Sequence, residues 1–232
     1  MRAVIFAAGR GRRLRPLTDS VPKPMIEIGG KPILGRTLES LPASVDHVVV
    51  VVGHLGDRVR RFLSGPASML RRIDVVEQKE LRGTYDALLT ACADLTQVRQ
   101  NSERVLALNG DDLYAKEDLE RLSAVRGSAV MTREIPGCGK FSHLETAEGR
   151  LARILAAAEH DGPSTRVYTG AAIINHEFFG LRPYRLPNGE YSLPHTLADN
   201  LNTHPVHVTD ASFWIPVGTP WELRAAEGVF AH

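Results

Sequence analysis

Short runs of apolar residues alternate with amphipathic segments through the first 135 residues of the chain. Several runs are continuous and rich in β-branched residues, as buried parallel strands are; they lie at 3–8, 47–53, 73–77, 105–108 and 129–132. The segments between them repeat apolar side chains three and four positions apart, which predicts helices over 55–63, 84–95 and 116–125. Thr84 is expected to cap the first turn of the second helix. Strands that alternate with helices indicate an α/β protein with a Rossmann-like, doubly wound sheet.

The pattern changes after about residue 133, where strands no longer alternate regularly with helices. In chain order we expect a hairpin over 141–154, a strand over 167–175, a helix over 190–202, a strand over 206–208 and a helix over 219–231. No internal repeat, low-complexity tract or linker interrupts the chain. We therefore expect one domain over 1–232, with an α/β half at 1–135 and a mixed half at 136–232.

Composition and charge narrow the class of protein. The 232 residues are 43% hydrophobic and 24% charged, with a formal net charge of +1. These values exclude a disordered or fibrous chain and favour neither nucleic acid nor a membrane surface as partner. The first apolar run is too short for a signal sequence or a membrane span, so a cytoplasmic location is expected. Cys92 and Cys138 lack metal-binding spacing and do not suggest a disulfide scaffold.

The strongest candidate for a binding site is the loop after the first predicted strand. Residues 9–24 read Gly-Arg-Gly-Arg-Arg-Leu-Arg-Pro-Leu-Thr-Asp-Ser-Val-Pro-Lys-Pro. Gly9 and Gly11 allow the backbone to approach a ligand, and exposed N–H groups in such a loop bind phosphate. Nearby arginines add cationic groups that suit phosphate oxygens. Lys23 lies between two prolines, which hold its ammonium group in a set direction.

Two common phosphate-binding signatures do not fit this loop. The dinucleotide-binding fingerprint requires a third glycine where Leu14 stands, and the Walker loop requires a Gly-Lys-Ser/Thr sequence that this loop lacks. A surface loop that binds no ligand is the remaining alternative. The two glycines together with Arg13, 16–18 and 22–24 favour a functional loop over that alternative.

The pattern Gly9-x-Gly11-x-Arg13-Leu14-x-Pro16-Leu17-Thr18, followed by Pro22-Lys23-Pro24, resembles the signature of sugar-1-phosphate nucleotidyltransferases. This family includes glucose-1-phosphate thymidylyltransferases, mannose-1-phosphate guanylyltransferases and muramate-1-phosphate uridylyltransferases. Further similarities lie at Glu77-Gln78, Gly83-Thr84, Asn109-Gly110-Asp111, Thr169-Gly170-Ala171 and 214–220. The resemblance covers most of the chain and implies the mixed sheet of nucleotide-diphospho-sugar transferases, in a short form without a β-helix domain.

The resemblance also implies a reaction. The phosphate of a sugar 1-phosphate would attack the α-phosphorus of an NTP in line and release pyrophosphate, with Mg²⁺ neutralising the phosphate charges. UTP, dTTP, GTP and CTP all remain open as donors. The oligomeric state is open as well, with a homodimer as the form that relatives suggest.

The resemblance assigns roles to individual residues. Those implied to be catalytic are Arg13, Lys23 and Asp111, and Asp111 is also the implied metal ligand. Those implied to bind the nucleotide are Ala7, Ala8, Gly9, Gly11, Arg12, Arg13, Gln78, Gly83 and Thr84. Those implied to bind the acceptor are Thr169, Gly170 and Glu159.

Two departures from the family pattern affect the acceptor side. Pro216 stands where the family usually has a second metal-binding aspartate. The family's Glu-Lys pair for the sugar phosphate is missing or displaced, with Glu159-His160 as a shifted substitute, although Arg153 and Arg166 offer guanidinium groups nearby. Two alternatives therefore stay open: a cytidylyltransferase-like enzyme for a phosphoalcohol, cyclitol phosphate or phosphonate, and a catalytically impaired regulatory subunit that binds nucleotides.

Overall fold

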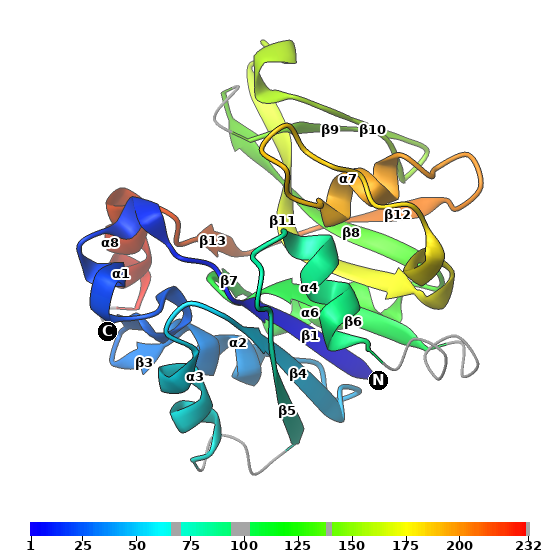
Figure 1. The fold of residues 1–232 in the computed structure, drawn as a ribbon. Coiled ribbons are helices and arrows are strands. Elements are labelled where there is room, and N and C mark those ends of the chain that lie inside the picture. The colour runs from blue at the N-terminus through cyan, green and yellow to red at the C-terminus, as the bar shows by residue number, and fades with distance from the viewer. Residues whose placement is uncertain (66–70, 94–102, 138–140, 231–232) are drawn as a thin grey trace.

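Four parallel strands form the core of the sheet that carries the N-terminal half. The computed structural model describes residues 1–65, 71–93, 103–137 and 141–230. In spatial order the core strands are β5 (Arg72–Glu77), β4 (His47–Val52), β1 (Arg2–Ala7) and β6 (Arg104–Asn109). Since β1 is buried between β4 and β6, both of its faces are apolar, as the sequence predicts (Figure 1).

The sheet continues into the C-terminal half with mixed strand directions. Beyond β6 the order is β11 (Ser164–Asn175), β8 (Ser128–Pro136), β12 (Val206–Asp210), β10 (Arg150–Leu155) and β9 (His143–Ala147). β11 is antiparallel to β6 and β8, so its N-terminal end extends past the carboxyl end of β6. This part of the sheet stands above the parallel core in Figure 1.

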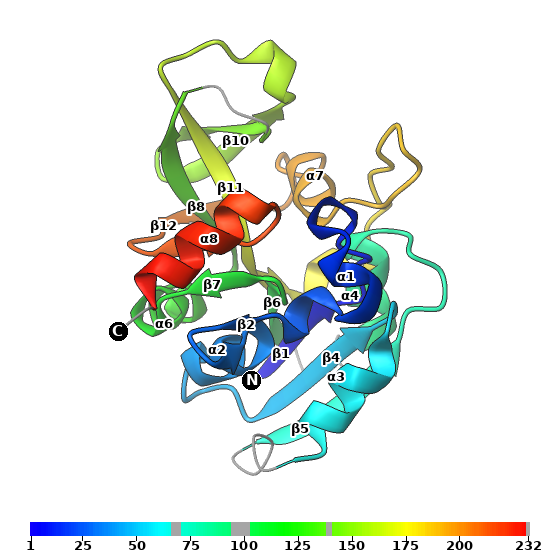
Figure 2. The ribbon, with the colours of Figure 1, turned by 90° about the vertical axis from the view of Figure 1, so that its left-hand side faces the viewer.

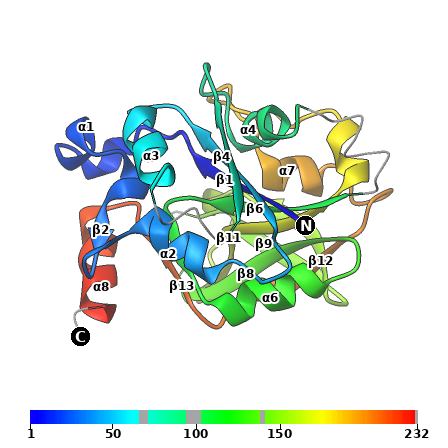
Figure 3. The same ribbon diagram turned by 90° about the horizontal axis from the view of Figure 1, so that it is seen from below.

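Helices cover both faces of the sheet. α4 (Thr84–Ala91) and α7 (Leu193–Ala198) lie on one face, and α2 (Ile33–Ser40) and α6 (Lys116–Ala124) lie on the other (Figure 3). α3 (Gly56–Leu63) buries Val59 and Leu63 in the same apolar cluster as α2 and α6. None of the helices in the part of the chain that the structure describes is long and apolar enough to cross a membrane.

A small additional sheet connects the end of the chain to the first half. β7 (Asp112–Tyr114) pairs in antiparallel fashion with β13 (Trp214–Pro216), and β2 (Glu27–Ile28) pairs with β3 (Lys31–Pro32). α8 (Pro220–Val229) follows β13, while α1 (Leu17–Ser20) lies in the loop after β1 (Figure 2). Leu14, Val217 and Ala226 share one apolar cluster, which packs the C-terminal segment against the first loop.

The fold confirms the α/β, doubly wound mixed sheet and most of its predicted elements. The role of Thr84 as a helix cap is wrong: Gly83 is the N-cap residue, and the Thr84 hydroxyl accepts a hydrogen bond from the Leu193 amide at 3.0 Å. The helix predicted over 190–202 is reduced to α7, because Pro194 stands near its start and Asn200 follows its end. Helix α2 and strands β7 and β13 were not predicted. The two strands have only three residues each, too few to show a period, whereas α2 is an amphipathic helix that the sequence-based predictions missed.

Three parts of the sequence-based predictions fall outside the described residues. These are the end of the helix predicted over 84–95, the last residue of the helix predicted over 219–231, and Cys138. Cys92 lies on the described part of the chain and is buried.

Candidate functional site

The loop that leaves β1 is shaped by its own hydrogen bonds. We call residues 9–24 the signature loop; it contains two short 3₁₀ turns, at Arg12–Leu14 and Lys23–Met25. The Thr18 hydroxyl donates to the Gly11 carbonyl oxygen at 2.9 Å. Gly11 has a φ of 59°, and a Cβ there would lie 2.9 Å from Thr18 Cγ2. Glycine is therefore required at this position both by its backbone conformation and by the space available.

A cavity of about 230 Å³ lies between the signature loop and the carboxyl end of β6. Its lining residues are Phe6, Ala7, Gly9, Gly11, Arg12, Arg13, Lys23, Pro24, Asp111 and Gly218. We call it the loop cavity. Three of its side chains are cationic and one is a carboxylate, a composition that suits phosphate oxygens and a hard divalent cation.

Lys23 and Asp111 meet inside the loop cavity. The Lys23 ammonium group donates to Asp111 Oδ2, and the two side chains are 10% and 31% exposed. A buried ammonium group is costly without a partner, so this contact holds Lys23 in place. The more exposed carboxylate keeps one face toward the cavity. The fold therefore joins two predicted catalytic residues that lie 88 positions apart in the sequence.

Asp112 adds a second carboxylate directly behind the cavity. Its side chain is 6% exposed and accepts a hydrogen bond from the Asn109 amide at 3.2 Å. Burial, helped by the negative charge of Asp111, raises the pKa of Asp112 to about 7. Asp112 is also the residue that faces Pro216 across the β7–β13 pair. A carboxyl group thus lies opposite the proline, although it points into the protein interior.

A larger cleft of about 790 Å³ continues from the loop cavity toward α4. We call it the outer cleft. It shares Phe6, Gly9, Gly11, Arg12 and Asp111 with the loop cavity. Its other lining residues are Ala8, Arg10, Gln78, Lys79, Glu80, Leu81, Gly83, Thr84, Ala87, Asn109 and Glu190. The two spaces together form a groove along the carboxyl ends of the parallel strands, where open α/β sheets bind ligands.

The C-terminal segment closes one side of the loop cavity. A Cβ at Gly218 would lie 2.9 Å from Arg13 Nη2 and 3.1 Å from Glu222 Oε2, so the guanidinium and the carboxylate both approach this glycine closely. The Gly218 amide and the Thr219 hydroxyl each donate to Glu222 Oε2 at 2.9 Å. The start of α8 therefore fixes the wall against which Arg13 rests.

Thr169 and Gly170, which were predicted to bind the acceptor, lie in an irregular part of β11 behind the outer cleft. Thr169 is fully buried, and its hydroxyl donates to the Met131 carbonyl oxygen at 3.0 Å. Gly170 has a φ of 83°, and a Cβ there would overlap the side chain of Asn109. Because Asn109 lines the outer cleft, this part of β11 supports the wall of the cleft without lining either space itself.

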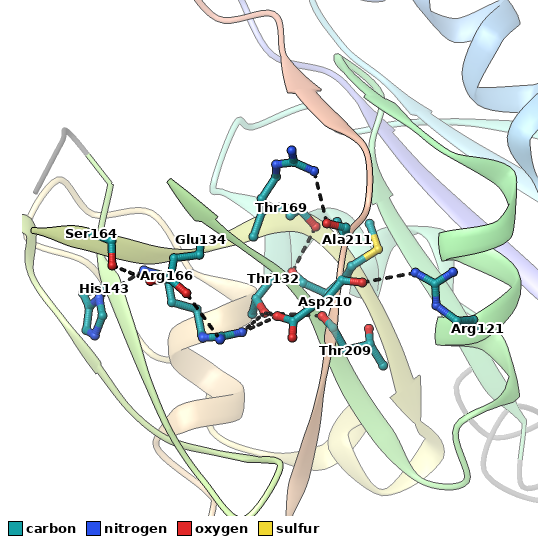
Figure 4. A network of polar contacts seen from close by, with 12 residues as sticks. Arg121, Thr132, Glu134, His143, Ser164, Arg166, Thr169, Thr209, Asp210 and Ala211 are labelled. Carbon is teal, nitrogen blue, oxygen red and sulfur yellow. Dashed lines mark hydrogen bonds and ion pairs between the residues drawn. The ribbon is translucent and has the colours of Figure 1, made fainter. Parts of the chain in front are cut away.

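Two arginines of the C-terminal half, Arg153 and Arg166, are bound to carboxylates. Figure 4 shows Arg166 reaching across the sheet to Asp210 and Thr132, with Glu134 on its other side. Its Nη1 donates to the Asp210 carboxylate and, at 3.1 Å, to the Thr132 hydroxyl. Arg153 forms a two-point pair with Glu145 at 2.6 and 3.0 Å. Neither arginine lines the loop cavity or the outer cleft.

Glu159 is also engaged elsewhere. Its carboxylate accepts a hydrogen bond from the Ala156 amide at 2.7 Å and closes a 3₁₀ turn at Ala157–Glu159. The side chain is exposed and lines neither space. The structure thus brings together the residues predicted to be catalytic and to bind the nucleotide, but it does not bring Glu159 to them.

Several residues of the groove were not predicted from the sequence. Phe6, Ala87 and Glu190 line it and belong to no recognisable motif. Asp112, which lies behind the groove, was not predicted either, although it directly follows a candidate metal ligand. Glu190 comes from a loop more than 100 positions beyond Gln78, and no pattern along the chain indicates that approach.

The chemistry of the groove fits a magnesium ion shared with a substrate. Asp111 offers carboxylate oxygens at the junction of the two spaces, and the Asn109 amide lies beside it. Among the described residues, no three His, Cys, Asp or Glu side chains form a metal-binding group. Mg²⁺ commonly takes one or two carboxylates and completes its coordination with water and substrate phosphates. The single carboxylate of Asp111 is compatible with an ion of this kind.

Comparisons with known proteins show which proteins the chain resembles. The chain is 28% identical over 238 residues to the bifunctional protein GlmU of Methanococcus maripaludis strain C7, covering 100% of this chain and 55% of that protein. It is 39% identical over 163 residues to the mannose-1-phosphate guanylyltransferase catalytic subunit beta of Xenopus tropicalis, covering 67% of this chain and 44% of the relative. The chain thus spans about half the length of the curated relatives it matches.

The fold is shared with a solved structure as well. A Bacillus anthracis protein provisionally assigned as a glucose-1-phosphate thymidylyltransferase, crystallised with sucrose, superposes with a TM-score of 0.81 at 19% identity. The match covers 99% of this chain and 95% of the other. The sequence model of the MobA-like NTP transferase domain matches residues 3–176, which include β1, the signature loop, Gln78 and Asp111. The chain therefore belongs to the family of proteins with a MobA-like NTP transferase domain.

Proposed function

We propose that this protein transfers a nucleotidyl group from an NTP to a sugar 1-phosphate, giving an NDP-sugar and pyrophosphate. The observation that carries the proposal is the groove in which Arg12, Arg13 and Lys23 surround Asp111 and which continues to Gln78. A triphosphate fits among the cations, and a base fits at the far end. The family membership supports the same class of reaction.

The chemistry asks little covalent work of the protein. An oxygen of the acceptor phosphate forms a bond to the α-phosphorus of the NTP, the bond to the β-phosphate oxygen breaks, and pyrophosphate leaves. Both substrates are anions, so the protein must hold them in line and neutralise their charge. We assign the backbone around Gly9 and Gly11 to the triphosphate, and Arg13 and Lys23 to the charge that develops on pyrophosphate.

Asp111 would hold Mg²⁺ in this reaction. When bound, the ion would supply positive charge that neutralises the phosphate oxygens. Lys23 already neutralises the Asp111 carboxylate from inside the cavity, and its buried stem keeps the ammonium within reach of phosphate oxygens. The N-terminal half at 1–135 then serves the NTP, and the half at 136–232 serves the acceptor.

The test is turnover by the purified chain. UTP, dTTP, GTP, CTP and ATP are each combined with Mg²⁺ and a panel of sugar 1-phosphates, and pyrophosphate release is measured. Release with at least one pair, abolished by EDTA and by Asp111→Asn, supports the proposal. Tight NTP binding without release under any combination contradicts it and favours a regulatory subunit.

One observation favours a second candidate, an enzyme for another phosphorylated acceptor. Arg153 and Arg166 are both bound to carboxylates. Among the described residues 141–230, no lysine or arginine lines the loop cavity or the outer cleft. The phosphate of a sugar 1-phosphate would then be bound by weaker electrostatic attraction than in enzymes that have a lysine at the acceptor site. Phosphoalcohols, cyclitol phosphates and phosphonates belong in the same panel. Turnover restricted to them would replace the sugar 1-phosphate as acceptor while leaving the NTP side unchanged.

A further inference from the structure

Gln78 is held more firmly than a residue that simply touches a base needs to be. It follows the last residue of β5, and its backbone amide donates to the Val52 carbonyl oxygen at 2.9 Å. Its side chain is 6% exposed and lines the outer cleft. Both its backbone and its side chain are therefore fixed at the end of the groove away from the loop cavity.

Two acceptors hold the nitrogen of the Gln78 amide. Nε2 donates to the Gly83 carbonyl oxygen at 3.1 Å and to Asp86 Oδ2 at 2.8 Å. An amide nitrogen has two protons, so both are used. A carbonyl oxygen and a carboxylate only accept hydrogen bonds, and rotating the amide by 180° would place Oε1 against both of them. The amide consequently has one stable orientation.

Asp86 is itself anchored by its helix. It lies in the first turn of α4, where the helix dipole favours a negative charge. The next residue back, Tyr85, is fully buried, and its hydroxyl donates to the Phe178 carbonyl oxygen at 2.7 Å. The Asp86 carboxylate is thus held beside Gln78 by a helix that is fixed, through Tyr85, to the segment that follows β11.

From these contacts we infer that Asp86 is a positioning residue for base recognition, acting through Gln78. With its amide nitrogen occupied, Gln78 can offer only Oε1, an acceptor, to a ligand in the outer cleft. A free glutamine can turn its amide and so meet either an N–H group or a carbonyl oxygen of a base. Asp86 removes that choice, and Gln78 then selects a nucleobase that presents an N–H donor at this point. This inference rests on the proposed function in that it takes the outer cleft as the base site.

The experiment compares equilibrium binding of UTP, dTTP, GTP, CTP and ATP, with Mg²⁺, to the wild type and to Asp86→Asn. Inorganic tripolyphosphate serves as a probe that carries the phosphates but no base. For Asp86→Asn we expect the ratio between the weakest and the tightest NTP to fall about tenfold, because a charged hydrogen-bond partner of the amide is lost. Tripolyphosphate affinity is expected to stay unchanged. The matched control is Asp57→Asn, an exposed carboxylate in the first turn of α3.

A double-mutant cycle separates positioning from a general structural effect. If Asp86 acts through Gln78, then Asp86→Asn changes NTP selectivity in the wild type but not in a Gln78→Ala background. Additive effects overturn the inference, and so does a selectivity equal to that of Asp57→Asn. Equal weakening of NTP and tripolyphosphate also overturns it, because the change would then not be at the base. Thermal denaturation checks that each variant is folded.

The outcome is independent of whether the chain turns over substrates. Selective NTP binding that depends on Asp86, without pyrophosphate release, would contradict the proposed reaction and support this inference. Pyrophosphate release, together with unchanged NTP selectivity in Asp86→Asn, would support the proposed reaction and contradict this inference.

Discussion

The two halves of the chain use their positive charges in different ways. In the N-terminal half, Arg12, Arg13 and Lys23 line the loop cavity around a single carboxylate. In the C-terminal half, Arg153 and Arg166 are bound to carboxylates across the sheet, away from the groove. The number of cationic residues in the sequence does not distinguish arginines that line a cavity from arginines that are paired with carboxylates. The comparison shows that a guanidinium group indicates a phosphate site only where the fold leaves it facing a cavity.

The largest expected effect lies at the carboxylate of the N-terminal half. Asp111→Asn should lower the rate of pyrophosphate release about 100- to 1000-fold, as the loss of one electrostatic group in an active site commonly does. The variant weakens the hold on Mg²⁺ and leaves the buried Lys23 ammonium without its ion pair. Steady-state rates over a range of Mg²⁺ concentrations measure this. Asp57→Asn is the control, and a rate within threefold of the wild type (roughly 0.6 kcal/mol) would remove Asp111 from the mechanism.

The second effect concerns the backbone of the signature loop. Gly11→Ala should lower the free energy of unfolding by about 2 kcal/mol, since alanine is strained at a positive φ and its Cβ would press on Thr18. Gly9→Ala is a matched control, because nothing lies within 4 Å of a Cβ at that position. Chemical denaturation compares the two. If they destabilise equally, the conformation of Gly11 is not what shapes the loop.

The signature loop and the parallel strands could be predicted because their information is local. A continuous apolar run such as 48–52 predicts a buried strand, and the two glycines of the loop lie only two positions apart in the sequence. The contact between Lys23 and Asp111 has no such local signal: it exists because β6 pairs with β1 and so brings both segments to one sheet edge. The family resemblance named the two residues, while the ion pair between them came only from the fold.

The acceptor side could be predicted less well for the same physical reason. Whether Arg166 faces a ligand or Asp210 depends on the register of β11, β8 and β12, which no pattern along the chain specifies. The position of Asp112 is another example. As a residue beside Asp111 it resembles a turn residue, but pairing with β13 buries it and turns it into a titratable group of the interior.

A third prediction uses the raised pKa of Asp112. The folded protein holds this proton more tightly than the unfolded chain, whose carboxyl titrates near 3.8, so unfolding becomes easier as the pH rises from about 4 to about 7. Above that window the destabilisation is complete. Asp112→Asn has no proton to lose and should be at least about 1 kcal/mol more stable than the wild type at pH 8, with little difference at pH 4. Denaturant unfolding without divalent ions at both pH values measures the difference. An equal difference at the two pH values would contradict the burial argument.

The smallest expected effect is that of Glu159→Ala, which tests whether Glu159 contacts the acceptor or only closes its turn. As a residue that closes an exposed 3₁₀ turn, it should cost less than about 1 kcal/mol of stability when changed to alanine. The KM for the acceptor should then be unchanged, because the side chain lines neither part of the groove. Asp161→Ala, an exposed carboxylate of the same loop, is the control. A KM for the acceptor that rises several-fold in Glu159→Ala alone, with the KM for NTP constant, would instead mean that the loop moves toward the groove when the acceptor binds. The contrast between cations that face the groove in the N-terminal half and cations that are paired in the C-terminal half would then hold only for the protein without substrate. Binding of the acceptor would complete the C-terminal half of the site.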